Sequence, residues 1–178
     1  METIEQRKQL YAGPILTLSE LTVRLPDGTT APRILVHTTG AAGVLALKQG
    51  RALFVRQWRT PLGQETLEVP AGKIEPGETP LQAAKRELNE EAQLAAEHWQ
   101  PLTHFYQSAG FSDAQTHLFL AEDFHAPAQQ RPQDVGESVQ GEWLSLQEAQ
   151  AAQQAGLICD AKTTLAVALW ALEEAKHG

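Results

Sequence analysis

The sequence predicts an α+β domain, in which helices flank a β-sheet. Apolar runs separated by turn residues fill the chain before residue 70, a marked helix start stands at Thr79, and further strand-like runs precede two helical patterns at the end. These observations together favour strands and helices grouped around one core. We expect the main domain over residues 39–178, with an N-terminal β-hairpin extension over residues 1–38.

Composition and charge exclude several classes of protein. The 178 residues are 42% hydrophobic and 20% charged, which is typical of a globular domain with a core. The formal net charge of −8 argues against nucleic acid as a partner. No apolar run approaches the roughly 20 residues that span a bilayer, so we expect no membrane partner. The charged start METIEQRKQLYAG and the single Cys159 favour a cytoplasmic location.

The N-terminal part of the chain reads as two hairpins and a further strand. The runs ILTLSELTVRL and APRILVH flank the turn residues PDGTT, and the runs AAGVLALK and RALFVRQW flank Gln49 and Gly50. The near-continuous hydrophobicity of AAGVLALK predicts a strand that is buried on both faces. Residues 65–69 predict the next strand. The pattern leaves open whether the hairpins form one sheet or two.

The first helix has a capping box at its start. Thr79 is the expected N-cap, Pro80 occupies the first helical position, and Gln82 closes the box. Leu81 and Leu88 then belong to an apolar stripe that predicts one buried face.

The rest of the chain predicts three strands and two helices. The strands are expected at residues 102–107 and 116–121 and within VQGEWLSL, and the helices at residues 146–155 and after the N-cap Asp160. We expect Phe105, Tyr106 and Trp170 in the core. The histidines show no spacing typical of a zinc site.

Three glutamates gather on one flank of the first helix. Glu87 and Glu91 lie one turn apart beside the apolar stripe, and Glu90 lies further round. A solvated acidic face is the simple alternative, because exposed like charges at this spacing cost only about 0.2–0.5 kcal/mol. Beside a cleft, carboxylates about 6 Å apart would repel by roughly 3 kcal/mol and would need a counter-ion. Such oxygen ligands favour Mg²⁺ or Mn²⁺.

Residues 72–94 resemble the Nudix box, G-x5-E-x7-R-E-U-x-E-E-x-G-U, in which U is a bulky aliphatic residue. The residues in register are Gly72, Glu78, Arg86, Glu87, Leu88, Glu90, Glu91 and Leu94. The late glycine of the box is Gln93 here. A non-glycine residue in a left-handed turn costs about 1 kcal/mol, so we expect a changed helix exit.

This resemblance implies the Nudix fold, a mixed β-sheet flanked by helices as an α/β/α sandwich. It also implies Mg²⁺ or Mn²⁺, two or three per site. The residues implied as metal ligands are Glu87, Glu90, Glu91 and the carbonyl of Ala71, and those implied as catalytic include Glu87, Glu91 and Arg86. We expect Arg86 to pair with Glu78, and Gly72 to allow a tight backbone turn.

Over residues 11–170 the chain looks like the ADP-ribose pyrophosphatase branch of that family. The matching stretches are LPDG, LFVRQWR, LEVPAGKIEPGE, SAGFSDAQTHLFLA and DAKTTLAVALW. The branch usually carries S-P-G-x-S-D-E in the loop where this chain has Ala109 and Ala114. The resemblance implies a hydrolase of nucleotide metabolism that cleaves the pyrophosphate bond of ADP-ribose to AMP and ribose 5-phosphate.

The same resemblance suggests residues for substrate binding. Arg59 is the best candidate for gripping a phosphate or the terminal ribose, and Arg56 is a second one. Glu68 is a candidate for polar groups of ribose or adenine, and Trp58 for stacking on a base. The alternatives are ordinary surface arginines, an edge-strand glutamate and a core tryptophan.

The resemblance also suggests the residue that positions or deprotonates the attacking water. Glu137 is our candidate and Asp134 is the next; a solvated loop carboxylate is the alternative. Members of the branch are typically homodimers whose N-terminal hairpins cross to the partner. Two other functions stay open: hydrolysis of another nucleoside diphosphate sugar or dinucleotide, and a non-catalytic ADP-ribose-sensing module.

Overall fold

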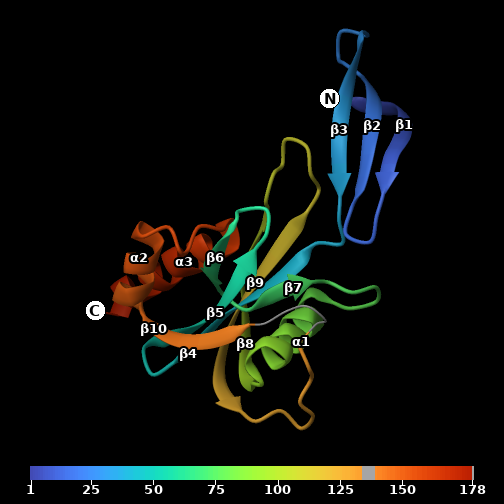
Figure 1. Ribbon diagram of the computed structural model, residues 1–178. Helices are drawn as coiled ribbons and strands as arrows, with labels where there is room; N and C mark the ends of the chain where they lie inside the picture. The colour runs from blue at the N-terminus through green and yellow to red at the C-terminus, as the bar shows by residue number, and fades with distance from the viewer. Residues whose placement is uncertain (134–138, 178) are drawn as a thin grey trace. The chain divides into compact units, whose positions relative to one another are not determined.

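The computed structural model describes residues 1–133 and 139–177, and the chain divides into two compact units (Figure 1). The first unit contains Met1–Gly40 and Phe105–Thr116, and the second contains Ala41–His104 and His117–Gly178.

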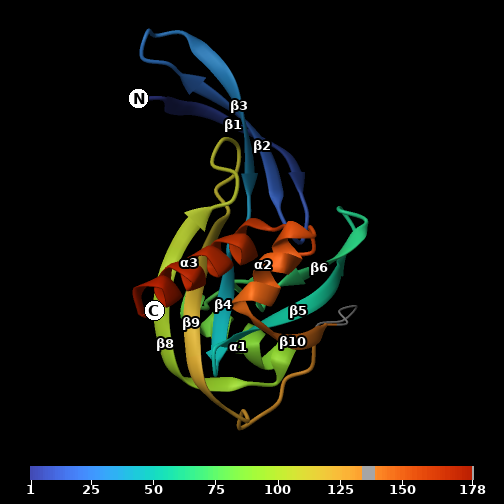
Figure 2. The ribbon, with the colours of Figure 1, turned by 90° about the vertical axis from the view of Figure 1, so that its left-hand side faces the viewer.

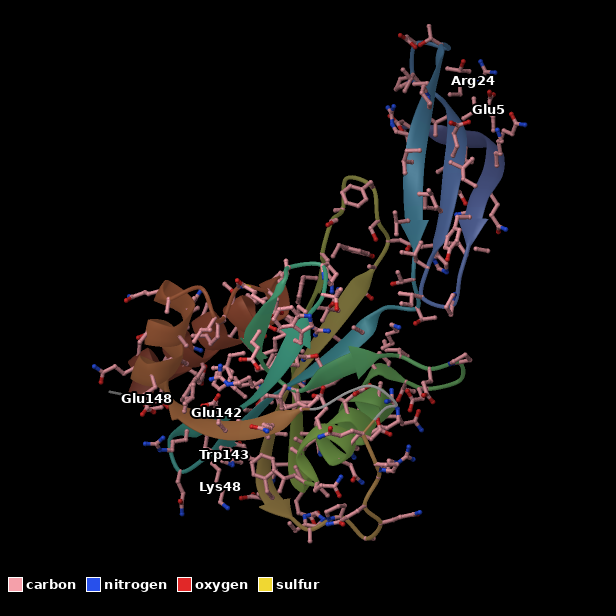
Figure 3. The ribbon with its side chains drawn as sticks, viewed as in Figure 1. Glu5, Arg24, Lys48, Glu142, Trp143 and Glu148 are labelled. Atoms are coloured by element: carbon pink, nitrogen blue, oxygen red, sulfur yellow. The ribbon has the colours of Figure 1, made fainter. Side chains whose placement is uncertain are left out.

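The first unit is built on a three-stranded antiparallel sheet in the order β1-β2-β3, with bounds β1 (Thr3–Ala12), β2 (Thr17–Arg24) and β3 (Thr30–His37). The predicted hairpin is β2–β3, which turns through Gly28 at a left-handed φ of 87°. The strand β1 was not predicted, because TIEQRKQLYA has no clear alternation of apolar and polar residues. It pairs through its backbone with β2 and through Glu5 with Arg24 (Figure 3).

The second unit is built on a mixed sheet in the order β10-β5-β4-β9-β8, with β6 paired to β5 and β7 paired to β4. Its strands are β4 (Ala41–Lys48), β5 (Arg51–Arg59), β6 (Gln64–Glu68), β7 (Ala71–Lys73), β8 (Ala95–Tyr106), β9 (Gln115–His125) and β10 (Gln140–Ser145). The two predicted hairpins therefore belong to two different sheets.

Helices cover both faces of this second sheet. Figure 2 shows α2 (Leu146–Gln154) and α3 (Ala161–His177) in front of its strands and α1 (Pro80–Ala92) behind them. The α/β/α sandwich predicted from the resemblance is confirmed. In the part of the chain that the structure describes, no helix is long and apolar enough to cross a membrane.

The core confirms most of the expected buried residues. Residues 42–46 of β4 are buried, as predicted for a strand covered on both faces. On the α1 side the buried cluster contains Ala42, Val44, Ala46, Leu53, Ala83, Ala84, Leu88, Phe119 and Ala121. Trp170 is buried in the α3 layer. The prediction for Tyr106 was wrong, since it is 55% exposed, and Phe105 is only partly buried. Both belong to the first unit, whose described residues include no helix that could cover them.

The helix α1 begins as the sequence predicts. The Thr79 hydroxyl accepts the Gln82 N–H at 3.3 Å, and the Gln82 side chain accepts the Thr79 N–H at 2.8 Å. The two bonds satisfy two donors that the start of a helix leaves without intrahelical partners.

The expected change at the end of α1 is not found. Gln93 adopts the left-handed conformation that a glycine would take, with φ 55° and ψ 37°. Its N–H donates to the carbonyl of Asn89 at 2.9 Å, and its side-chain amide donates to the same carbonyl at 3.0 Å. The second bond offsets the strain of about 1 kcal/mol that a side chain brings to this conformation.

Candidate active site

Arg86 lies at the centre of the glutamate cluster, with its side chain 8% exposed. Its Nε and Nη2 donate to the two carboxylate oxygens of Glu78 at 2.9 and 3.1 Å, so the predicted loop-to-helix pair is present. Its Nη1 donates to Glu87 at 2.6 Å and to Glu90 at 2.8 Å. Its Nη2 also donates to the carbonyl of Lys73 at 2.7 Å. One guanidinium therefore fixes the loop, the strand β7 and the helix relative to one another.

Arg86 stays protonated although its side chain is buried. Burial alone would lower the pKa of Arg86, but the bonds to Glu78 and the charge and bonds of Glu87 and Glu90 raise it above its usual value. The carboxylates thus face a permanent cation, which limits their mutual repulsion.

Glu87 and Glu91 are buried, at 8% and 6% exposure, beside the apolar stripe of α1. This placement excludes the alternative of a solvated acidic face for these two residues. The backbone N–H of Ala71 donates to Glu91 at 3.0 Å, so the start of β7 lies directly against this carboxylate. The structure therefore places Ala71 against Glu91, while Glu87 and Glu90 share Arg86; these are the four residues that the resemblance implies as metal ligands.

Gly72 leaves room for the Glu87 carboxylate. A Cβ at this position would lie 1.9 Å from Oε1 of Glu87, closer than any two such atoms can approach. Gly72 lies in β7 and has no left-handed φ, whereas Gly77 in the following loop has a φ of 87°. The expectation of a tight turn at Gly72 was wrong: the glycine is needed for space and not for backbone freedom.

The donor atoms of this cluster fit a divalent metal ion. Carboxylate oxygens of Glu87 and Glu91 and the carbonyl of Ala71 are the hard ligands that Mg²⁺ and Mn²⁺ prefer. Arg86 already occupies one oxygen of Glu87 and one of Glu90. Among residues 1–133 and 139–177, no three His, Cys, Asp or Glu side chains lie close enough together to hold an ion as they stand. Metal binding would therefore require these side chains to rearrange, so that carboxylate oxygens of Glu87 and Glu91 meet the backbone carbonyl of Ala71.

A second ionic network surrounds Glu68, three residues before Ala71 in the sequence. Arg59 donates to both Glu68 oxygens, from Nε at 2.7 Å and from Nη2 at 2.6 Å. The Thr66 hydroxyl donates to Glu68 at 2.7 Å, and the Lys162 ammonium contacts the other oxygen. The Glu68 side chain is only 2% exposed, which excludes a solvated edge-strand glutamate. Its oxygens are engaged by the protein itself, while Nη1 of Arg59 takes no part in this pair.

The partners of Glu68 determine its charge. Burial would raise the pKa of Glu68, but the hydrogen bonds of Arg59, the charge and bond of Lys162 and the Thr66 hydroxyl lower it to about 2. The same Glu68 bond raises the pKa of Arg59, against the effect of burial. Both members of the pair are therefore ionised over the whole neutral range.

Lys162 extends this network to the start of α3. Its ammonium donates to Asp160 at 2.9 Å, and the same Asp160 oxygen accepts the N–H of Thr163 at 3.1 Å, as predicted for an N-cap. The Thr163 hydroxyl accepts the N–H of Val69 at 3.1 Å. Lys162 stands in the stretch DAKT, but no sequence reasoning assigned it a role. The signal available was a basic residue next to a helix N-cap.

The remaining predicted substrate residues lie on β5. Arg56 pairs with Glu142 on β10 at 2.8 Å, with both side chains partly exposed. Trp58 is 60% exposed, so the alternative of a core tryptophan is excluded. Glu137 and Asp134 lie outside the described residues.

The chain is similar to known proteins over nearly its whole length. A model of the NUDIX domain matches residues 36–163. An ADP-ribose pyrophosphatase of Bacillus subtilis (strain 168) is 36% identical over 180 residues, which cover 98% of this chain and 97% of that protein. A methanol dehydrogenase activator of Bacillus methanolicus is 36% identical over 172 residues, covering 96% and 93%. The crystal structure of an ADP compounds hydrolase matches with a TM-score of 0.88 and 17% identity, covering 99% and 96%.

The variant Gly72→Ala tests the space beside Glu87. The added methyl forces the Glu87 carboxylate out of its place, so we expect the affinity for Mn²⁺, measured by calorimetry, to fall by at least roughly tenfold. The matched control is Gly110→Ala, whose methyl would meet no atom within 4 Å. Unchanged Mn²⁺ affinity in Gly72→Ala would contradict the assigned role.

The variant Glu68→Gln tests the second network through its pH dependence. Because the pKa of Glu68 is lowered from 4.5 to about 2 in the folded protein, its stabilisation is present above pH 4.5 and is lost as the pH falls toward 2. The difference amounts to roughly 3 kcal/mol. In urea unfolding, the stability gap between wild type and variant should therefore shrink over this range. A gap that stays constant, or one matched by the control Glu65→Gln at an exposed position of the same strand, would contradict this.

Proposed function

Because the chain belongs to the Nudix hydrolase family, we propose that it hydrolyses the pyrophosphate bond of ADP-ribose to AMP and ribose 5-phosphate. The observation that carries the proposal is the similarity to an ADP-ribose pyrophosphatase over nearly the whole of both chains. The cluster around Arg86 supports it, since the box glutamates are retained and two of them are buried beside Ala71.

Mg²⁺ or Mn²⁺, two or three per site, is the proposed cofactor, with Glu87, Glu91 and the Ala71 carbonyl as ligands and Glu90 in support. A divalent cation there would neutralise charge on the diphosphate and activate water. Arg86 orients Glu87 and Glu90 by hydrogen bonds, and Gly72 keeps the space that Glu87 needs.

Arg59 is the proposed phosphate or ribose contact. Glu68 holds its guanidinium by two parallel hydrogen bonds along the Nε–Nη2 edge, while Nη1 takes no part in this pair. A guanidinium fixed in this way binds phosphate oxygens with little loss of side-chain entropy. Glu68 would then act by positioning Arg59, in addition to the expected contact with polar groups of ribose or adenine. The exposed indole of Trp58 would stack on adenine, and Arg56 would add positive charge along the same strand.

Glu137 is the proposed residue that positions or deprotonates the attacking water, with Asp134 as the next candidate. Its support is the resemblance alone, because both residues lie outside the described part of the chain. The single exposed Cys159 is in keeping with a reducing, cytoplasmic location.

We also propose that the chain forms a homodimer through residues 1–38. The three-stranded sheet and the loop after β1 expose several large apolar side chains, namely Ile4, Leu10, Tyr11, Ile15 and Ile34. A small sheet without a second layer is marginally stable in water, and exposed apolar side chains of this kind favour burial against a partner.

A second candidate function is hydrolysis of another ADP-containing compound. Two observations favour this second function. The fold is similar to that of an ADP compounds hydrolase, and Ala109 and Ala114 replace two loop residues that the branch usually carries. A non-catalytic sensing module is disfavoured, because Glu87, Glu90 and Glu91 are all present.

The variant Glu91→Gln tests the proposed reaction. Removing one buried carboxylate should lower the turnover of ADP-ribose with Mg²⁺ by roughly 100-fold or more while circular dichroism stays unchanged. The exposed Glu122→Gln on β9 serves as control. AMP and ribose 5-phosphate are quantified by chromatography, beside a panel of nucleoside diphosphate sugars and dinucleotides. Near wild-type rates in Glu91→Gln would reject it as a ligand, and a faster panel compound would replace ADP-ribose as substrate.

Sedimentation at micromolar concentration tests the dimer. Wild type should sediment with about twice the chain mass of 19.5 kDa. The double variant Leu10→Asp/Ile34→Asp should sediment as a monomer, because each substitution charges the exposed apolar surface. Leu172→Asp, on the exposed side of α3, is the matched control. A monomeric wild type would contradict the proposal.

A further inference from the structure

A segment that follows β9, residues 129–133, is held against α1 by side chains of the helix. We propose that Asn89 and Gln93 are positioning residues: they clamp residues 129–131 onto the last turn of α1 and thereby place Arg131 against Glu90. The inference rests on the proposed function, since Glu90 belongs to the glutamate cluster that would support the metal ion.

Asn89 pairs with the segment as a neighbouring strand would. Its Nδ2 donates to the carbonyl of Gln129 at 2.8 Å, and its Oδ1 accepts the N–H of Arg131 at 3.1 Å. One amide group thus satisfies a backbone acceptor and a backbone donor two residues apart. Two bonds from a single side chain define the distance and the register of the segment relative to α1.

Gln93 adds a third bond that a glycine could not make. Its Nε2 donates to the carbonyl of Arg131 at 2.6 Å and to that of Asn89 at 3.0 Å. The backbone at Gln93 is left-handed, a conformation that glycine adopts without strain and glutamine does not. The chain therefore accepts strain at the helix exit and gains a tie to the segment.

The clamp determines where the Arg131 side chain lies. Its Nη1 is 3.4 Å from Oε1 of Glu90, while Oε2 of Glu90 accepts from Arg86 at 2.8 Å. The Arg131 side chain is 54% exposed and this ion pair is long, so the pair alone would hold Arg131 weakly. The backbone bonds of the clamp keep the second guanidinium at Glu90, which is thereby oriented from two sides.

The segment is also tied at its far end. The Gln133 side chain donates to the carbonyl of Val139 at 2.9 Å and accepts the N–H of Val139 at 3.1 Å. With Asn89 and Gln93 at one end and this pair at the other, residues 129–133 are held on both sides by amide side chains.

Two substitutions remove the clamp without weakening the helix. Gln93→Gly relieves the left-handed strain and loses both side-chain bonds, and Asn89→Ala places a better helix former within α1 and loses the other two. If the glutamine only ended the helix, Gln93→Gly would be neutral or stabilising. The matched control is Gln49→Gly in the β4–β5 turn, because Gln49 has a φ of 52° and no hydrogen bond from its side chain to a described residue.

Hydrogen exchange and Mn²⁺ titration of the full chain test the proposal together. In Gln93→Gly and Asn89→Ala we expect the Arg131 amide to exchange about tenfold faster and the dissociation constant for Mn²⁺ to rise about fivefold. The kcat for ADP-ribose should fall by a similar factor with little change in KM, and Gln49→Gly should change none of these. These results would support the clamp.

Two results would overturn the proposal. Unchanged exchange in both variants would show that no clamp exists, and faster exchange with unchanged Mn²⁺ affinity would show that the clamp does not orient Glu90. Neither readout requires substrate. If the wild-type protein does not cleave ADP-ribose, the proposed function is rejected. Hydrogen exchange and Mn²⁺ binding would still test whether Asn89 and Gln93 form the clamp.

Discussion

The buried guanidinium of Arg86 is the interaction on which the site depends. It contacts Glu78 in the loop, Glu87 and Glu90 on the helix, and the carbonyl of Lys73 on β7. Three carboxylates could not be packed so closely at the edge of an apolar core without a permanent cation among them. Because arginine stays charged at any accessible pH, the cluster keeps one arrangement in which Glu91 and the backbone of Ala71 complete the set of oxygen donors.

A second network supports the same strand edge from the opposite helix layer. Glu68 joins Arg59 on β5 to Lys162 on α3, and Thr163 binds the backbone of Val69 only two residues before Ala71. The backbone between Val69 and Ala71 is thus fixed from both faces of the sheet. This gives the proposed metal ligands and the proposed phosphate contact a common rigid frame, which is what precise alignment of a diphosphate requires.

Local patterns allowed much of this to be predicted from the sequence. The capping box at Thr79 and the pairing of Arg86 with Glu78 follow from short-range spacing, and the structure has both. The strand β1 could not be predicted because its side chains carry no apolar alternation. The need for Gly72 depends on where the Glu87 carboxylate lies in space. Likewise, the burial of Glu68 depends on Lys162, a partner 94 residues away. Such long-range contacts leave no periodic signal in one sequence.

The proposed reaction requires oxygens of Glu87, Glu91 and Ala71 to hold a divalent ion at a bound diphosphate. Anomalous diffraction from crystals grown with Mn²⁺ and a non-hydrolysable ADP-ribose analogue measures this directly. We expect Mn²⁺ peaks about 2.0–2.3 Å from these three groups and from phosphate oxygens. A bound analogue whose Mn²⁺ lies elsewhere, with no metal ion at Glu87 and Glu91, would contradict this proposal.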